Sequence, residues 1–253
     1  REISDDITTT KVEDLPRRDL APGEVRIAMR AASVNFPDIL MIQGKYQYKP
    51  PLPFVPGMEG AGEVIEIGEG VTSFAVGDGV VGGLRTGGFA EEAIAQASAV
   101  RKIPTGMDFV AASAYPAAYL TAYVALKRRG NLQAGETLLV HGAAGGVGLA
   151  AVDLGLHFGA KVIATASSEE KRNFLSLRGA SLVLPSSGFR EPVKEFTGGL
   201  GADVIYDPVG GDVFDESVRC IAFDGRLLVI GFTSGRIPEI SVNMPLIKGF
   251  SVV

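Results

Sequence analysis

A glycine-rich stretch between a predicted strand and a predicted helix constrains the fold of this chain more than any other feature. The stretch HGAAGGVG spans 141–148 and follows the apolar run TLLVH at 137–141. Apolar residues then recur at helical spacing on one face from Val147 to Phe158, and a second apolar run, KVIAT, spans 161–165. A strand, a glycine-rich turn, an amphipathic helix and a further strand are the context that a dinucleotide-binding loop requires.

The loop departs from the pattern G-x-G-x-x-G at one position. Aligned to that pattern, residues 143–148 read AAGGVG, so an alanine stands at the first glycine position. We expect Gly145 to let the backbone approach a pyrophosphate and Gly148 to let the helix pack close to the strand. Free N–H groups at the helix start would face the phosphates, and the alternative is a tight turn without a ligand. The predicted ligands of the dinucleotide are Ala144, Gly145, Gly146, Val147 and Gly148.

The end of the second predicted strand favours NADPH over NADH. An NAD site usually places an acidic residue there to bind the ribose hydroxyls, but residues 165–168 read TASS. An acidic pair follows at 169–170, and Ser167 with Glu170 fits a capping box in which Ser167 is the helix N-cap. Hydroxyl groups, a helix N-terminus and Lys171 suit a 2′-phosphate, whereas ribose binding by the acidic pair would favour NADH. The predicted ligands of the 2′-phosphate are Ser167, Ser168 and Lys171.

Two regions of different rhythm indicate two domains. In the first hundred residues, short apolar runs are cut by Gly and Pro, which is typical of a barrel-like β domain. From about residue 106, strand-like runs alternate with helix-like segments, which predicts an α/β domain with a parallel sheet covered on both faces. We therefore predict a β domain at 1–105 and a dinucleotide-binding domain at 106–253.

Composition excludes several other classes of function. The net charge of -5 argues against a nucleic-acid or anionic-membrane surface. The chain has neither an apolar run long enough for a membrane span nor a signal-peptide pattern, so we expect a cytoplasmic protein. The one cysteine, Cys220, excludes an intramolecular disulfide and is interpreted as a packing residue. His141 and His157 lack partners at metal-ligand spacing, so we predict no metal and expect a nicotinamide to carry the chemistry.

The chain resembles the zinc-independent quinone oxidoreductases of the medium-chain dehydrogenase/reductase superfamily. The resemblance rests on SVNFPDILMIQGKY (33–46), PLPFVPGMEGAGEVIEIGEGV (51–71), HGAAGGVG (141–148), DPVGG (207–211) and GFTSG (231–235). It implies a GroES-like β-barrel catalytic domain and a Rossmann domain. The implied activity is NADPH-dependent hydride transfer to a quinone or to the β-carbon of an α,β-unsaturated carbonyl.

The resemblance also implies roles for individual residues. Zinc-dependent relatives have His and Cys ligands where this chain has Met58 and Asn35, which argues against catalytic zinc. Asn35 and Tyr46 match polar positions of the substrate site that bind a developing oxyanion, and Tyr46 could also donate a proton, unless it is an exposed loop aromatic. Thr121 matches a position that touches the nicotinamide, unless its hydroxyl only bonds its own helix backbone. Asp207 with Gly210 would shape the loop beside the ribose, and Phe232 and Ser234 would line the nicotinamide pocket.

The chain differs from the family pattern in two respects, and two other functions remain as alternatives. A Tyr that often helps to hold the 2′-phosphate is not evident in LVLPSSGF at 182–189. The family usually continues for about 70–80 residues beyond this chain and starts with about ten more, so we expect a truncated sequence. An enoyl-thioester reductase and a non-catalytic NADPH-binding sensor remain alternatives. Relatives are usually dimers that pair Rossmann edge strands, so we expect a homodimer in which Phe250–Val253 forms part of the edge.

Overall fold

The computed structural model describes residues 3–253 and divides the chain into two compact units, 1–117 and 118–253. The boundary that the sequence rhythm predicts at 105/106 lies before α2 (Phe109–Ser113), a short helix that packs on strands of the first unit. Helix α3 (Tyr115–Tyr123) then runs across the division. Within residues 3–253, we find no helix with both the length and the apolar composition that a membrane crossing needs.

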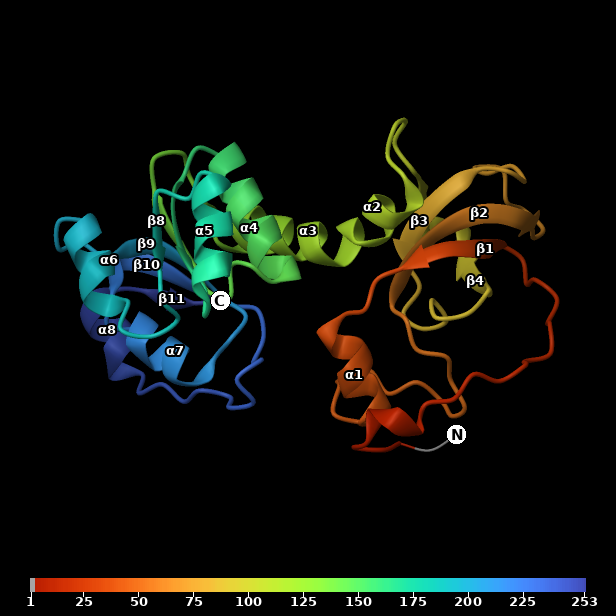
Figure 1. The fold of residues 1–253 in the computed structure, drawn as a ribbon, viewed down its shortest axis with the longest axis horizontal. Coiled ribbons are helices and arrows are strands. Elements are labelled where there is room, and N and C mark those ends of the chain that lie inside the picture. The colour runs from red at the N-terminus through yellow and green to blue at the C-terminus, as the bar shows by residue number, and fades with distance from the viewer. Residues whose placement is uncertain (1–2) are drawn as a thin grey trace. The chain divides into compact units, whose positions relative to one another are not determined.

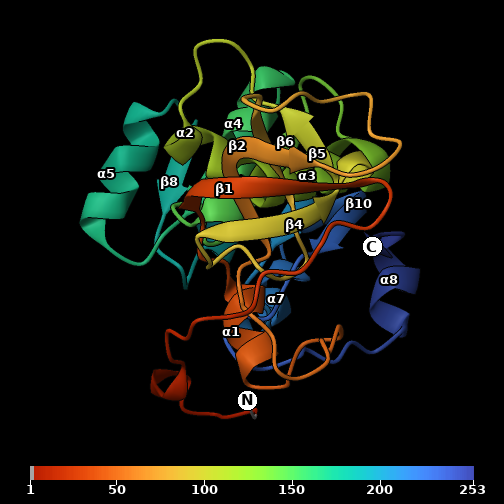
Figure 2. The same cartoon turned by 90° about the vertical axis from the view of Figure 1, so that its right-hand side faces the viewer.

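The first unit is built on an antiparallel sheet, as the short apolar runs predict. Within the described residues it has five strands in the order β4-β1-β2-β3-β5, and β1 is seen between β2 and β4 in Figure 2. Alternate residues of these strands, among them Val25, Ile27, Val64 and Val80, are buried in one core. The other elements of the unit are η1 (Ile7–Thr9), α1 (Phe36–Ile42), η2 (Ala97–Ala99) and α2. The strands are β1 (Glu24–Ala32), β2 (Glu59–Ile67), β3 (Gly79–Gly83), β4 (Glu92–Gln96) and β5 (Val100–Lys102).

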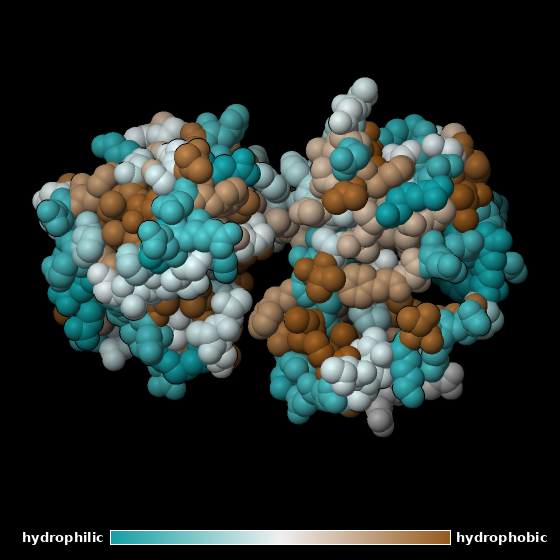
Figure 3. Space-filling model, viewed as in Figure 1, coloured by the Kyte–Doolittle hydropathy of each residue, from teal (hydrophilic) through white to brown (hydrophobic). Residues whose placement is uncertain are grey.

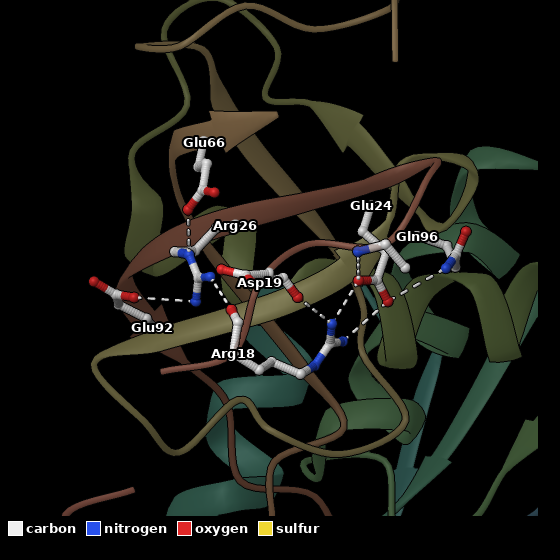
Figure 4. Close-up of polar contacts among 8 residues, drawn as sticks. Arg18, Asp19, Glu24, Arg26, Glu66, Glu92 and Gln96 are labelled. Carbon is white, nitrogen blue, oxygen red and sulfur yellow. Dashed lines mark hydrogen bonds and ion pairs between the residues drawn. The ribbon is translucent and has the colours of Figure 1, made fainter. Parts of the chain in front are cut away.

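A buried arginine ties neighbouring strands of this sheet together. Arg26 on β1 is only 4% exposed, and its Nε donates to Glu66 Oε2 on β2 at 2.7 Å (Figure 4). Its Nη1 lies 3.4 Å from Glu92 Oε2 on β4, and its Nη2 donates to the carbonyl of Arg18. The hydrogen bond from Arg26 holds the pKa of Glu66 below its usual value. The segment before β1 is thereby attached to the sheet.

The second unit holds a parallel sheet covered on both faces, as the strand–helix alternation predicts. Over residues 3–253 this sheet has six strands in the order β11-β10-β9-β6-β7-β8. Along β6, Leu138 and Val140 face one core while Leu139 faces the other. The strands are β6 (Thr137–Val140), β7 (Lys161–Thr165), β8 (Leu182–Leu184), β9 (Ala202–Asp207), β10 (Ile221–Val229) and β11 (Ser251–Val252).

Each core of the second unit is closed by its own set of helices (Figure 1). Residues of α3, η3, α4 and α5 contribute to the first core, and residues of α6, α7 and α8 contribute to or pack against the second. The strand order reverses between β6 and β9, so the carboxyl ends of these strands flank the position where open parallel sheets bind ligands. The helices not yet bounded are η3 (Val124–Arg129), α4 (Gly146–His157), α5 (Glu169–Leu177), α6 (Arg190–Phe196), α7 (Gly211–Ser217) and α8 (Asn243–Lys248).

Candidate cofactor and substrate sites

The glycine loop lies over the carboxyl ends of the central strands. Directly after β6, His141 N donates to Tyr206 O on β9 at 3.0 Å. Ala143 N donates to Thr165 O at the end of β7, also at 3.0 Å. Gly142 takes the left-handed conformation, with φ 55°, which turns the chain back toward α4. The loop therefore occupies the switch point at which the strand order reverses.

Two glycines of the loop meet different surroundings. A Cβ on Gly148 would lie 2.3 Å from Gly142 O and 2.8 Å from Gly142 C, so this position admits only glycine without movement of the backbone. A Cβ on Gly146 would meet no heavy atom of the described chain within 4 Å. Packing therefore explains Gly148, whereas Gly146 is exposed and no packing contact of the described chain requires glycine there.

The start of α4 offers hydrogen-bond donors at Gly146. Leu149 N donates to Gly145 O at 2.7 Å, so the N–H groups of Gly146, Val147 and Gly148 precede the first bond of the helix. Gly145 is the N-cap and has no side chain with which to satisfy them. N–H groups at the positive end of a helix dipole bind anions such as a pyrophosphate. The loop thus fits a dinucleotide at the position that the sequence predicts.

The segment after β7 carries the predicted ligands of a 2′-phosphate, but its capping differs from the prediction. Helix α5 begins at Glu169, and its N-cap is Ser168, whose Oγ accepts from Lys171 N at 3.3 Å. The prediction that Ser167 is the N-cap, paired with Glu170 in a capping box, is therefore wrong by one residue. Ser167 lies in the bend before the cap, and Ser167, Ser168 and Lys171 are all exposed.

Arg172 is a cation of this segment that the sequence interpretation missed. Its Nη1 donates to Ala166 O and Ser167 O, each at 3.2 Å. The guanidinium thus holds the backbone of the loop that carries the predicted phosphate ligands. The sequence contained a signal for Arg172, which directly follows Lys171 near the start of the predicted helix. A cation there interacts unfavourably with the positive end of the helix dipole, so a second one in succession indicates a specific contact.

The loops after β9 and β10 are joined by hydrogen bonds around Asp207. Asp207 is 1% exposed, and its Oδ1 accepts from Val209 N at 2.8 Å and from Gly210 N at 3.0 Å. Burial raises the pKa of this carboxyl, against the lowering effect of the two amide donors. Ser234 N donates to Val209 O at 3.0 Å. Asp207 thereby holds the backbone of the strand-end loop at 209–210, and its place beside a ribose stays a prediction.

Gly210 and the predicted nicotinamide residues lie together in these loops. Gly210 has φ 68°, and a Cβ there would lie 3.0 Å from Phe232 Cδ1. Phe232 is half-buried and Ser234 is exposed. Thr121 is exposed on α3, and within the described chain its hydroxyl makes no hydrogen bond to its own helix. The structure thus leaves Phe232, Ser234 and Thr121 accessible, and their contact with a nicotinamide remains a prediction.

His141 is a buried structural residue, as its isolated position in the sequence indicates. Its Nδ1 lies 3.1 Å from Thr165 Oγ1, and its Nε2 lies 2.8 Å from Ser217 Oγ. Ser217 Oγ donates its own proton to Val213 O at 2.7 Å, so we assign the imidazole proton to Nε2. Burial lowers the pKa of His141 to about 3, which keeps the ring neutral. The ring therefore joins the ends of β6 and β7 to α7.

Cys220 is also inert. The thiol is fully buried, and burial together with the charge of Glu216 raises its pKa to about 12. Among residues 3–253, no group of three or more His, Cys, Asp or Glu side chains is placed to hold a metal ion.

In the first unit, a buried carboxylate gathers the residues around Asn35. Glu59 on β2 is 2% exposed, and its Oε1 accepts from Ser33 Oγ and, at 2.8 Å, from Asn35 Nδ2. Asn35 Nδ2 also donates to Ser33 Oγ at 3.1 Å. Both N–H bonds of the Asn35 amide are thereby used within the unit. Donation from Asn35 to a substrate oxygen, which the resemblance implies, would require one of these bonds to be exchanged.

Asp38 fixes the segment where zinc-dependent relatives have a histidine ligand. Asp38 is 1% exposed, and its Oδ1 accepts from Gly57 N at 3.2 Å and from Met58 N at 3.0 Å. Its Oδ2 accepts from Asn35 N at 2.8 Å. The backbone N–H groups of Asn35 and Met58 are therefore held by the same carboxylate, and neither residue is of the Cys, His or carboxylate types that zinc prefers.

Apolar residues gather on the surface over α1 (Figure 3). Phe36 is the first residue of α1 and is 46% exposed, and the neighbouring Val34 is 74% exposed. Tyr46 lies in a bend after α1 and is half-buried. A surface of exposed apolar groups beside polar ones suits an aromatic or apolar ligand.

Comparisons with known protein families match both units. Residues 21–105 match the alcohol dehydrogenase GroES-like domain, and residues 146–253 match the zinc-binding dehydrogenase family. Quinone oxidoreductase-like protein 2 of Mus musculus is 40% identical over 245 residues, which cover 96% of this chain and 70% of the mouse protein. A homolog of that protein in Nematostella vectensis is 46% identical over 247 residues, which cover 96% of this chain and 67% of the homolog.

Solved structures show the same architecture. Escherichia coli quinone oxidoreductase complexed with NADPH superposes with a TM-score of 0.87 at 32% identity, over 96% of this chain and 75% of that chain. A mycobacterial protein complexed with NADPH gives a TM-score of 0.89 at 35% identity, over 95% and 76% of the two chains. The CurK enoyl reductase gives 0.86 at 29% identity, over 95% and 74%.

Proposed function

Because this chain belongs to the quinone oxidoreductase family of the medium-chain dehydrogenase/reductase superfamily, we propose that it is an NADPH-dependent reductase of quinones or α,β-unsaturated carbonyl compounds. The glycine loop carries the proposal, because it brings uncapped N–H groups at the start of α4 to the carboxyl ends of β6 and β7, where open parallel sheets bind ligands. When bound, NADPH supplies the hydride, and the protein supplies position and polarity.

The second unit would hold the nucleotide. The N–H groups of Gly146–Gly148 would bind the pyrophosphate. Ser167, Ser168 and Lys171 would bind the 2′-phosphate, on a loop whose carbonyl groups Arg172 holds. The relatives solved with NADPH support this choice, as does the lack of an acidic residue at the end of β7.

The first unit would bind the acceptor. A quinone or enone gains negative charge on oxygen as it takes the hydride, and a hydrogen-bond donor then stabilises that oxygen. Tyr46 and Asn35 are the proposed donors, and Tyr46 would also pass a proton to the reduced product. The exposed apolar groups around α1 suit the ring of such an acceptor.

A nucleotide titration tests the proposal. We would titrate the protein with NADPH and with NADH by nucleotide fluorescence, then add phenanthrenequinone and follow the nicotinamide absorbance. We expect selective binding of NADPH and its oxidation by the quinone. Preference for NADH would contradict the assignment of Ser167, Ser168 and Lys171 and point to Glu169 or Glu170 as ribose ligands.

A matched pair of lysine variants sharpens the cofactor assignment. Lys171→Glu should weaken NADPH binding by about 10-fold, because an exposed charge pair contributes about 1 kcal/mol or less and its reversal adds repulsion. NADH binding should change little. Lys161→Glu is the control, because Lys161 is an exposed residue at the opposite end of β7. Equal losses for the two nucleotides would contradict the 2′-phosphate role of Lys171.

An enoyl-thioester reductase is the second candidate. CurK enoyl reductase and a polyketide synthase component that is 39% identical over 230 residues support it. Oxidation of NADPH by an α,β-unsaturated acyl thioester, but not by the quinone, would favour this activity. Tight NADPH binding without oxidation by either acceptor would favour a sensor.

We also propose a homodimer in the cytoplasm. The proposal rests on the resemblance, since relatives pair Rossmann edge strands, and over residues 3–253 β11 is the outermost strand on one side of the parallel sheet. Light scattering after size-exclusion chromatography tests the dimer.

A further inference from the structure

We propose that Glu59 is a positioning residue that joins Asn35 and the first turn of α3 in one hydrogen-bonded unit. It thereby holds Asn35 and the start of α3, the helix that carries Thr121, on one buried carboxylate of the first unit. The meaning of those two residues for catalysis rests on the proposed function, whereas the hydrogen-bonded unit itself does not.

The two oxygen atoms of Glu59 reach different elements. Oε1 accepts from Ser33 Oγ and Asn35 Nδ2, which lie between β1 and α1. Oε2 accepts from Ala117 N at 2.6 Å, in the first turn of α3. Thr121 lies one turn further along the same helix. The side chain of Glu59 therefore contacts two segments that carry predicted site residues. One segment contains Asn35, and the other is helix α3, which contains Thr121.

The first turn of α3 needs such an acceptor. The first N–H groups of a helix have no partner within it, and Pro116 has no N–H to offer. Ala117 N–H is thus the donor that a group outside the helix must satisfy, and a carboxylate at this end also meets the positive end of the helix dipole.

Glu59 needs these donors in turn. A buried carboxylate is costly unless its oxygens are hydrogen-bonded or paired with a cation. Among residues 3–253, no Lys or Arg forms an ion pair with Glu59, so the donors on Ser33, Asn35 and Ala117 take the place of water and of a counter-ion. A charge held in this way constrains all of its partners, because moving any one of them exposes a buried polar atom without a bond.

Hydrogen exchange of the cofactor-free protein tests the unit directly. In Glu59→Gln, one carboxylate oxygen becomes an –NH2 group and the other loses its negative charge, so the hydrogen bond from Ala117 N is either lost or weakened. We expect the Ala117 amide to exchange at least about 10-fold faster than in the wild type, because one buried hydrogen bond is worth about that factor. Glu63→Gln is the control on the same strand, because Glu63 is 40% exposed and forms only a 3.7 Å ion pair with Arg30.

Kinetics test the consequence for catalysis. We expect Glu59→Gln to lower kcat by about 10-fold or more while KM for NADPH stays within about 2-fold, because a misplaced residue acts on the transition state. In the double variant Glu59→Gln, Thr121→Ala, the fold-decrease in kcat should be smaller than the product of the two single fold-decreases. The reason is that Glu59 and Thr121 act through the same helix, α3. Glu59→Asp should not restore kcat, because its carboxylate is one methylene short of Ala117.

The outcomes separate this inference from the proposed function. If wild-type protein oxidises no NADPH with any acceptor, the proposed function fails, and the exchange of Ala117 still decides the role of Glu59. The inference would be overturned if the Ala117 amide of Glu59→Gln exchanged at the wild-type rate. It would also be overturned if the fold-decrease in kcat of the double variant with Thr121→Ala equalled the product of the two single fold-decreases. If Glu59→Gln does not fold, Ser33→Ala removes one donor to the same carboxylate and should speed the exchange of Ala117, whereas no change would count against the unit.

Discussion

At the scale of single residues, Gly146 and Gly148 separate the requirements of the fold from those of a ligand. A methyl group at 148 would collide with Gly142 O at 2.3 Å, so Gly148→Ala should lower the free energy of unfolding by about 1–3 kcal/mol. A methyl group at 146 meets no described atom within 4 Å, so Gly146→Ala should fold at least as stably as the wild type. Its affinity for NADPH should fall, because the methyl group fills the space proposed for the pyrophosphate.

Chemical denaturation and a fluorescence titration of both variants check this pair. Normal NADPH binding by Gly146→Ala would remove the pyrophosphate from that position, and normal stability of Gly148→Ala would show that the loop yields to a side chain.

His141 should make the protein sensitive to acid. Its pKa falls from 6.5 in an unfolded chain to about 3 in the fold. Between these values the unfolded state binds a proton that the folded state does not, so the free energy of unfolding decreases as the pH falls. The largest slope that one such proton allows is about 1.4 kcal/mol per pH unit.

Denaturation between pH 6.5 and 4.5 tests this before most carboxylates titrate. His141→Asn should show a shallower slope than wild type, whereas replacement of the exposed His157 by Asn should leave the slope of the wild type. Equal slopes for wild type and His141→Asn would mean that His141 is protonated in the fold.

Local chemistry could be predicted at this scale, and contacts between distant residues could not. The loop glycines and the interpretation of His141 as a residue without metal-ligand partners follow from the sequence itself. The capping residue of α5 was misplaced because two serines in succession both suit an N-cap, and only the backbone conformation selects Ser168. Glu59 was missed because its partners come from three separate segments, although an acidic residue between glycines in VPGMEGAG was a readable signal.

At the scale of elements, Arg26 should decide how firmly β1 holds its neighbours. Arg26→Met keeps the buried stem and removes the guanidinium that bonds Glu66 and the carbonyl of Arg18. We expect a loss of about 1–3 kcal/mol in the free energy of unfolding, since the carbonyl of Arg18 and the carboxylate of Glu66 both lose a charged donor. Arg30→Met is the control on the same strand, because Arg30 is 55% exposed and should cost no more than about 0.5 kcal/mol. Equal losses would show that the stem of Arg26, not its charge, holds the strand.

The predicted elements agree best where the hydrophobic pattern is unambiguous. Buried parallel strands such as β6 and β7 are short apolar runs between turn signals, and both lie at the predicted positions. Helix α4 likewise begins at Gly146 and ends within one residue of the predicted Phe158. The short helices α2 and α8 carry too few turns for a period to show, so their position depends on packing that the sequence pattern does not reveal.

At the scale of the whole molecule, each unit has buried cores of its own. Val25, Val64 and Val80 belong to a cluster confined to the first unit, and the two clusters on the faces of the parallel sheet are confined to the second. A unit with its own core can unfold on its own. We therefore expect calorimetry to show two transitions, of which Arg26→Met lowers one and Gly148→Ala lowers the other.

NADPH should raise the midpoint temperature of only one of the two transitions, the one whose midpoint Gly148→Ala lowers. The glycine loop, the proposed 2′-phosphate ligands and the proposed nicotinamide residues all lie in the second unit, so the proposed site would bind the nucleotide only when that unit is folded. At a concentration of 100 times Kd, this linkage adds about 2.7 kcal/mol to the free energy of unfolding of that unit. Gly146→Ala should keep both transitions and lose the shift with NADPH. A single transition whose midpoint shifts with Arg26→Met, with Gly148→Ala and with NADPH would show instead that the two units unfold together. Their cores would then be separate in packing but would not unfold independently.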